Sequence, residues 1–344
     1  MSACRKGGLR VTEGKRNGIS VGRGIVVLTC LFELGCSPQA AVDTYLDAVM
    51  LRELGQEALA VEKLKAVIQV DRDFASAYSE LGKAYMALDD YGRAADAFTA
   101  ATRLDPWSLE DHMGLAQSLR ELGRPEAAAG AYARAAELEP DCLEALVGAA
   151  ECYVRAGRYI EALSYCELAE QTGRDPRRVL ILWALVHEGR NDYERAIQTY
   201  RRLLALDGSD HEVLLSLGVA HMKAGQYDDA RDVLTSMARA HPEDGRPYRH
   251  LGFCAVKRGR TDEAIELYRK AIDLDIEDWE AHRGLGVAYM VRARQDGDER
   301  LQASAVRHWR RSLELNPEQP KHRILERLIR EHRERTNPLQ GLDY

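Results

Sequence analysis

Cysteine is the residue type in this sequence with the widest chemistry, since thiols can form disulfides, hold metals, act as nucleophiles or accept lipids. The seven copies are irregularly spaced, and no two have the CxxC spacing of a zinc or redox site. They are Cys4, Cys30, Cys36, Cys142, Cys152, Cys166 and Cys254. We expect neither a zinc site nor a disulfide framework. We expect a buried inert thiol at Cys166, and a Cys152–Cys166 bridge stays open as the alternative if the protein is exported.

Histidines and other catalytic groups show no arrangement that is typical of an active site. His187 and His221 lie in register with Tyr85 and Tyr153, which predicts imidazoles packed in a core rather than ligands. The chain contains no phosphate-binding GxxxxGK[ST] loop, no GxGxxG after a strand, no HExxH and no GxSxG. The sequence therefore predicts no catalytic residue, no metal and no cofactor, and we do not expect an enzyme.

The first forty residues differ from the remainder in charge and pattern. Six basic side chains precede an apolar run over residues 25–32, after which come Gly35 and Cys36. A basic segment followed by a short apolar segment and a small residue is typical of a secretory signal. The run is too short to span a membrane, which takes about 20 apolar residues. Gly35-Cys36 resembles the end of a bacterial lipoprotein signal, although Glu33 stands where that family prefers leucine.

This resemblance implies that residues 1–35 are removed and that Cys36 becomes a diacylated N-terminus in the cell envelope, with 36–40 as a linker. Two alternatives stay open, namely membrane targeting of another kind and a basic tail with a chance apolar patch. A true start at Val21 rather than Met1 would shorten the leader.

Charge limits the class of partner. The 344 residues have a formal net charge of −7, and the first forty contribute +4, so the remaining body is acidic. Because nucleic-acid binding needs a basic face that neutralises phosphates, we expect no nucleic-acid partner. Alanine, leucine, glutamate and arginine dominate the middle of the chain and favour helix.

A period of 34 residues organises the chain from residue 41 to residue 319. Alanine recurs at one position of the second predicted helix in all eight units. These residues are Ala60, Ala94, Ala128, Ala162, Ala196, Ala230, Ala264 and Ala305. Position eight of the first helix, counted from the start of each unit, is always glycine or alanine. Small residues at both positions predict two helices that cross closely.

The residues at these positions resemble those of the tetratricopeptide repeat family. A bulky residue follows four positions after each alanine, as at Phe98 and Tyr268, and glycine ends many first helices. The resemblance implies an all-α fold, a right-handed solenoid of eight helix-turn-helix units. The predicted units are 41–74, 75–108, 109–142, 143–176, 177–210, 211–244, 245–278 and 279–319, the last with seven extra residues between its helices.

A further helix is predicted over residues 320–335, followed by a tail over 336–344. Apolar residues such as Ile324 and Leu328 give this helix one face, and basic residues cover the rest. We expect it to cap the last unit, as terminal repeats of solenoids require. A separate basic binding site is the alternative.

In this family the first helix of each unit lines a concave channel that receives the partner. Positions five, nine and twelve form a stripe beside the packing positions four, eight and eleven. The stripe is polar in units two and three, where it includes Lys83, and apolar with a basic margin in units six to eight. The predicted groove residues are Leu215, Val219, Met222, Lys223, Arg249, Phe253, Val256, Lys257, Arg283, Val287 and Met290.

Together these features predict a scaffold that binds a polypeptide in its concave groove, as an envelope lipoprotein serving assembly of an envelope complex. A cytosolic adaptor or regulatory subunit of signalling or secretion machinery is the alternative. The stripe has no asparagine, so the carboxylate clamp of chaperone-binding relatives is not expected. A superhelix tight enough to bury the stripe against itself also stays open.

Overall fold

The computed structural model describes residues 38–335, which form helices joined by short turns, with no strand among them. The helices are α1 (Pro38–Glu53), α2 (Glu57–Val70), α3 (Ala75–Ala87), α4 (Tyr91–Leu104), α5 (Leu109–Glu121), α6 (Pro125–Leu138), α7 (Leu143–Arg155), α8 (Tyr159–Gln171), α9 (Pro176–Gly189), α10 (Tyr193–Leu206), α11 (His211–Lys223), α12 (Tyr227–Ala240), α13 (Gly245–Lys257), α14 (Thr261–Leu274), α15 (Trp279–Asp296), α16 (Glu299–Leu315) and α17 (His322–Arg335).

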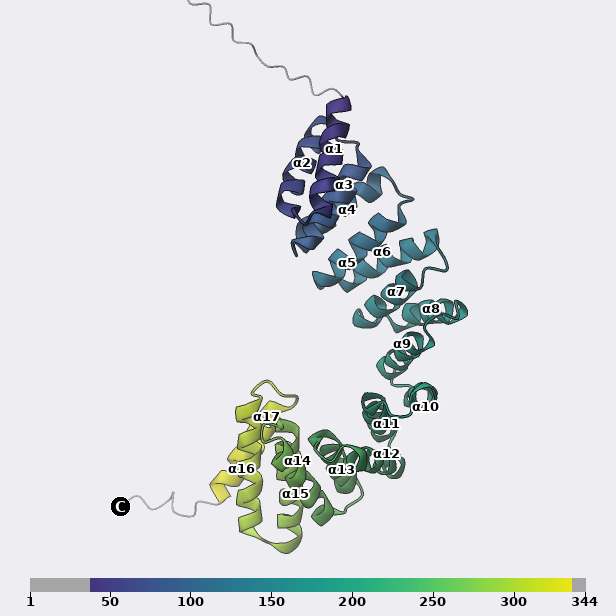
Figure 1. Cartoon of the computed structure of the whole chain (residues 1–344). Helices are drawn as coiled ribbons and strands as arrows, with labels where there is room; N and C mark the ends of the chain where they lie inside the picture. The colour runs from purple at the N-terminus through teal and green to yellow at the C-terminus, as the bar shows by residue number, and fades with distance from the viewer. Residues whose placement is uncertain (1–37, 336–344) are drawn as a thin grey trace, which may run out of the picture.

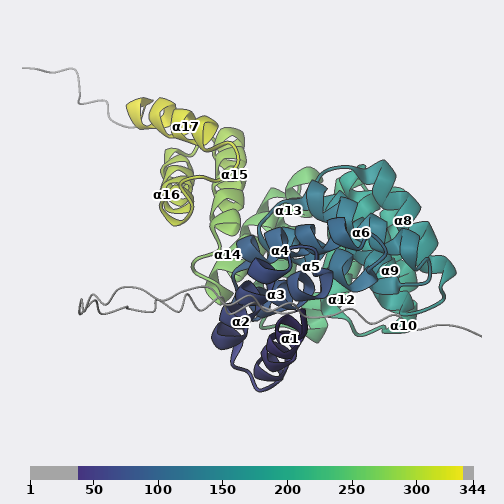
Figure 2. The same ribbon diagram turned by 90° about the horizontal axis from the view of Figure 1, so that it is seen from above.

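These helices form eight consecutive pairs and a single final helix, which confirms the predicted all-α solenoid with its capping helix. The pairs follow one another from α1 to α12 along one side of the molecule, and α13 to α17 turn back (Figure 1). Seen from above, α15 to α17 project from the coil of the earlier helices (Figure 2).

Capping residues define where the helices begin and end. The side chains of Asp210 and Asp278 accept hydrogen bonds from N–H groups in the first turns of α11 and α15. Gly225 ends α11 in the left-handed region at φ +79°, which glycine adopts without steric cost. In unit 177–210, Asn191 replaces glycine at the equivalent position and adopts the same conformation, at φ +59°. Short turns of this kind place the second helix antiparallel to the first.

The alanine of each second helix lies at the helix crossing, and all eight are 0% exposed. A bulky residue then fills the space between consecutive first helices. A Cβ on Gly82 would lie 2.8 Å from the ring of Phe98, and one on Gly114 would lie 2.5 Å from the same ring. Each bulky residue therefore packs against its own unit and the next one.

One local expectation needs correction, and one alternative that the sequence left open is answered. The seven extra residues of the last unit do not form a loop, because they lengthen α15 to 18 residues and α16 to 17. The Cys152–Cys166 bridge is not formed, and both thiols are free and buried. Burial raises the pKa of Cys166 to about 12, so this thiol is protonated and inert near neutral pH.

Candidate partner-binding groove

A cavity of about 660 Å³ lies on the concave side of the last two units, between α13, α15 and α17. We call it the C-terminal groove. Seven of the eleven residues predicted from the repeat register line it, and they come from α11, α13 and α15. They are Met222, Arg249, Phe253, Val256, Lys257, Arg283 and Val287.

The apolar part of the groove is open to solvent. Phe253 is 37% exposed and Val287 is 40% exposed, although both lie on helices whose other faces are packed. Met222 and Val256 are half-buried against the core beneath them. Phe253 is held edge-on against Tyr227, with ring centroids 6.3 Å apart. The alternative that curvature buries the stripe does not apply to Phe253 and Val287.

The remaining four predicted residues do not line this cavity. Leu215 and Val219 lie half-buried on α11, and Lys223 at its end is exposed, 3.8 Å from a carboxylate oxygen of Glu188. The prediction was wrong for Met290, which is 6% exposed and belongs to the core. Its equivalents Met222 and Val256 lie one residue before a helix end, whereas α15 continues for a further six residues past Met290.

The third wall of the groove comes from the final helix and the turn before it, neither of which was predicted to line the groove. Pro320, Lys321, Ile324, Leu325 and Leu328 all line the cavity. The apolar face of this helix was visible in the sequence, but it was interpreted only as a cap. Ile324 stays 46% exposed, so part of that face is turned to the groove rather than to the core.

Two of the basic groove residues are already engaged within the chain. Nη1 of Arg249 lies 2.9 Å from Oδ2 of Asp278 and 3.1 Å from Oε2 of Glu280. Nη1 of Arg283 donates to the carbonyl oxygen of Pro320 at 3.4 Å, and its guanidinium lies over the ring of Trp279. These contacts fix the two arginines in place, and Glu280 offsets one of their charges.

The lysines at the rim are less constrained. Lys257 has no ion-pair partner among residues 39–332, and its ammonium lies 5.4 Å from the ring centroid of Phe253. Lys321 is exposed and likewise has no carboxylate partner within that range. Of the groove-lining residues, Glu280 is the only one with a carboxylate in the described part of the chain. The rim therefore has a net positive charge that favours an acidic ligand.

The floor contains residues that lie outside the predicted stripe. Tyr268 lies under Gly284, where a Cβ would be 2.3 Å from the tyrosine ring. His250 also lines the cavity, and burial together with the nearby Arg249 lowers its pKa to about 4. The imidazole is therefore neutral at pH 7. The sequence features that could have indicated this opening were histidine and glycine at position six of the last two units, His250 and Gly284.

The equivalent stripe in the first half of the array is closed by ion pairs. Nζ of Lys83 lies 2.8 Å from Oε1 of Glu80 and 2.6 Å from Oε1 of Glu110. Ser79, one turn earlier on the same helix, is buried. The predicted contrast between a polar and an apolar half of the stripe is therefore present in the packing.

Other predicted features lie outside this site. Cys36 falls outside the described residues. No helix between residues 38 and 335 is both long and apolar enough to cross a membrane. Within the same range, no group of three or more histidine, cysteine or carboxylate side chains is arranged to hold a metal. The predicted core histidine His187 is 6% exposed and stacks on Trp183.

Among solved structures, the fold is similar to that of a tetratricopeptide repeat protein from Parabacteroides merdae ATCC 43184, with 16% identity, a TM-score of 0.49, and coverage of 73% of this chain and 99% of that one. It is also similar to YrrB, described as a TPR protein with an unusual peptide-binding site (23% identity, TM-score 0.45, coverage 54% and 96%). A third is MamA from Desulfovibrio magneticus RS-1 (26%, 0.43, 52% and 96%). No curated protein matches the sequence.

Family profiles match the sequence in the region of the helix pairs. The profile described as Tetratricopeptide repeat matches residues 113–176 and 181–245, and a second profile with that description matches 75–106. A profile described as TPR repeat matches residues 49–89 and 255–290. These matches together cover more than half of the chain and fall on the paired helices α1 to α15. The chain therefore belongs to the tetratricopeptide repeat family.

Proposed function

We propose that the protein is a non-catalytic scaffold that captures an amphipathic, acidic segment of a partner polypeptide in the C-terminal groove. The supporting observation is the exposure of Phe253, which is 37% exposed inside a cavity. It lies beside Lys257, which has no carboxylate partner in the described chain. An exposed aromatic residue that contributes little to the core is a typical binding anchor.

The two parts of the groove would have different roles in binding. Phe253, Val256 and Val287 offer an apolar floor to one face of the ligand, and burial of these side chains supplies affinity. Lys257 and Arg283 would attract carboxylates on its other face, which mainly raises the association rate and makes it sensitive to salt. The cavity of about 660 Å³ accepts a few side chains, so a short segment suffices.

The test uses a photo-crosslinking residue in place of Phe253 to identify the partner in the native host, followed by binding measurements with the purified pair. Phe253→Ala should weaken the complex by about 2 kcal/mol, or roughly thirtyfold in Kd. Ile276→Ala removes an equally apolar side chain that is 67% exposed outside the groove, and it should leave Kd unchanged. Both variants should melt within a few degrees of the parent protein.

The opposite pattern contradicts the proposal. If Phe253→Ala lowers the melting temperature strongly and leaves Kd intact, then the side chain serves the fold and the partner binds elsewhere. Equal loss of affinity in the Phe253 and Ile276 variants would point to a nonspecific apolar contact.

We further propose that the scaffold is attached to the cell envelope through lipid on Cys36, after removal of residues 1–35. This rests on the sequence Gly35-Cys36 after a short apolar run, and on the need for two acyl chains for stable anchoring. An envelope attachment would place the groove where partners of an assembling envelope complex could reach it.

Labelling with radioactive palmitate in a bacterial host tests this anchor. The parent protein should incorporate label and sediment with membranes, whereas Cys36→Ala should do neither. Cys142→Ala is the matched control, because this cysteine is half-buried in the solenoid and should not affect labelling. Parent and Cys36→Ala proteins that are equally soluble and unlabelled would instead support the cytosolic adaptor.

A further inference from the structure

The first helix of the array exposes two positions that the later units bury or partly cover. Position six of a first helix faces the bulky residue of the preceding unit, as when Gly114 meets Phe98. Position ten lies one turn further on the same face. Its later residues are at most 2% exposed: Ala84, Ser118, Cys152, Val186, Ala220, Cys254 and Ala288. In the first unit these positions are Leu46 and Met50, which are 54% and 56% exposed.

Carboxylates surround the two exposed apolar residues. Asp43, Asp47 and Glu53 project from the same side of α1, and this side has no basic residue of its own. Asp47 pairs with Lys63 of α2 at 2.8 Å, whereas Asp43 and Glu53 have no ion-pair partner in the described chain. We call this surface, with Leu46 and Met50, the acidic end face.

The other end of the solenoid has the opposite charge. In the repeat register α17 is the first helix of a ninth unit, and no second helix follows it among the described residues. Positions four, eight and eleven, which in unit seven are the buried Tyr248, Gly252 and Ala255, face a unit's own second helix. In α17 they are Arg323, Arg327 and Arg330, all exposed.

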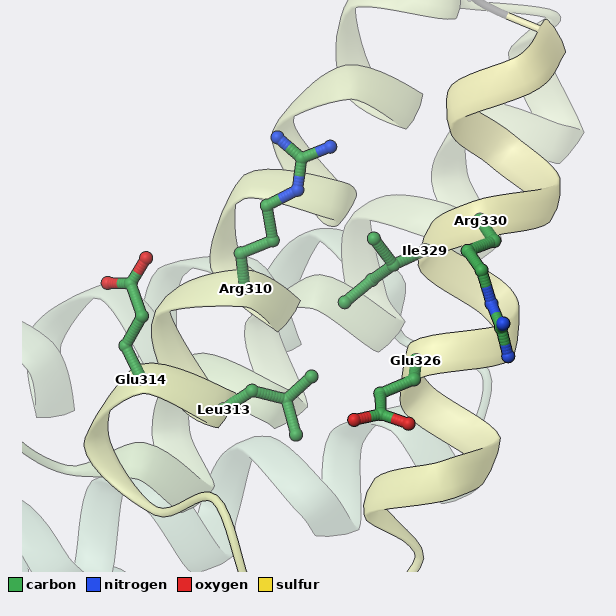
Figure 3. A pocket seen from close by; sticks show the side chains of 6 residues that line it. All are labelled: Arg310, Leu313, Glu314, Glu326, Ile329 and Arg330. Carbon is green, nitrogen blue, oxygen red and sulfur yellow. The ribbon is translucent and has the colours of Figure 1, made fainter.

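A cleft of about 510 Å³ between α16 and α17 adjoins these arginines. Leu313 and Ile329 point into it from the two helices, and Arg310 and Arg330 lie at its edges (Figure 3). Its carboxylates are Glu326 and Glu314, and the latter is bound to Arg311 at 3.3 Å. We call the exposed arginines of α17 and this cleft the basic end face.

We propose that the acidic end face of one copy binds the basic end face of another, so that the protein associates head to tail. Leu46 and Met50 would enter the cleft beside Leu313 and Ile329, while the carboxylates around them meet the arginines. Two acidic faces would repel each other, which disfavours a head-to-head pair. Because the two faces differ, the contact does not close on itself and copies can add in succession.

Sedimentation velocity of the full chain with Cys36→Ala, which excludes any contribution of lipid, tests this contact. The weight-average mass should rise with protein concentration and fall with added salt, which screens exposed charges. Asp43→Lys with Glu53→Lys reverses the acidic end face, and Arg323→Glu with Arg330→Glu reverses the basic one. Each double variant should stay monomeric where the parent protein associates. All four side chains are exposed, so circular dichroism and melting should not change.

An equimolar mixture of the two double variants should associate again, because each reversed face now matches the other variant's ends. Asp96→Lys with Asp273→Lys is the control. It makes the same charge change as Asp43→Lys with Glu53→Lys, but at exposed sites along the array, and it should associate like the parent. A parent protein that is monomeric at every concentration overturns the proposal. So does association that survives reversal of the basic end face, because the contact would then not depend on the arginines of α17. Either result would leave partner binding at Phe253 untouched.

Discussion

Lys83 and Phe253 occupy the same position, the ninth, in units two and seven, and they differ in every other respect. Lys83 is bound by two glutamates, one in its own unit and one in the next. Phe253 has an aromatic neighbour and a lysine above its ring, and it stays exposed. The repeat register fixes where both side chains point. The residue type then decides whether the stripe is closed by internal ion pairs or stays available to a partner.

The largest expected difference between the two halves is their response to acid. His250 and His308 both belong to the last two units, and burial lowers the pKa of each to about 4. Since the unfolded chain binds these protons below about pH 6.5, stability should fall as the pH drops from about 6.5 to about 4. The loss is at most about 3 kcal/mol for each histidine at full effect.

Hydrogen exchange followed by mass spectrometry at pH 7 and pH 5, corrected for intrinsic rates, would locate this loss. Protection should fall first in α13 to α16, and less in α3 to α6. Replacing His250 and His308 by glutamine should remove most of the difference. A uniform loss along the array would show that the acid response does not come from these two residues.

Overpacking at the helix crossings, in contrast, should destabilise the two halves equally. Ala128 and Ala230 are both 0% exposed at helix crossings. Ala128→Leu and Ala230→Leu should each lower the free energy of unfolding by about 1–3 kcal/mol through overpacking. Urea unfolding monitored by circular dichroism measures both, and Ala303→Leu at an exposed position of α16 is the control. An unchanged midpoint for either core variant would mean that its helix crossing is looser than described.

The smallest stability effects should come from replacing Lys83 and Lys257, which compare the groove stripe of the first half directly with that of the second half. Lys83→Met leaves Glu80 with Arg52 alone and Glu110 with no partner, and it should cost about 1–2 kcal/mol of stability. Lys257→Met removes only a cation over a ring and should change stability by no more than about 0.5 kcal/mol. In a partner-binding assay the order of the two effects should reverse, so that Lys257→Met weakens binding more than Lys83→Met does. Similar stability losses in both variants would remove the distinction between a closed and an open stripe.

The sequence predicted the features that depend on repeated packing. The alanine at each crossing and the glycine or alanine at position eight reveal the helix pairs, because only small residues allow that approach. The same register placed Phe253 and Val287 on the concave side, since side-chain direction on a helix follows from spacing.

The unpredicted features arise where the repeat pattern ends or changes. Met290 became buried because α15 continues past the point where other first helices end. The groove wall formed by Ile324 and Leu328 depends on how α17 docks with no second helix of its own among the described residues, and no earlier unit provides a template for that. His250 and Tyr268 line the cavity together with the small Gly284, a combination of residues that occurs in this pair of units alone among those described.

Because α17 forms one wall of the groove, the affinity for a partner depends on the fraction of molecules in which this helix is docked. Only molecules with this helix docked present the complete site, so the measured dissociation constant equals the intrinsic one divided by the docked fraction. If half of the molecules had α17 undocked, affinity would fall about twofold without any change in α13 or α15. A tag fused at the C-terminus, or a truncation before His322, should therefore weaken capture even though Phe253 is untouched. Conversely, a bound partner should slow hydrogen exchange in α17, although this helix has no paired second helix between residues 38 and 335.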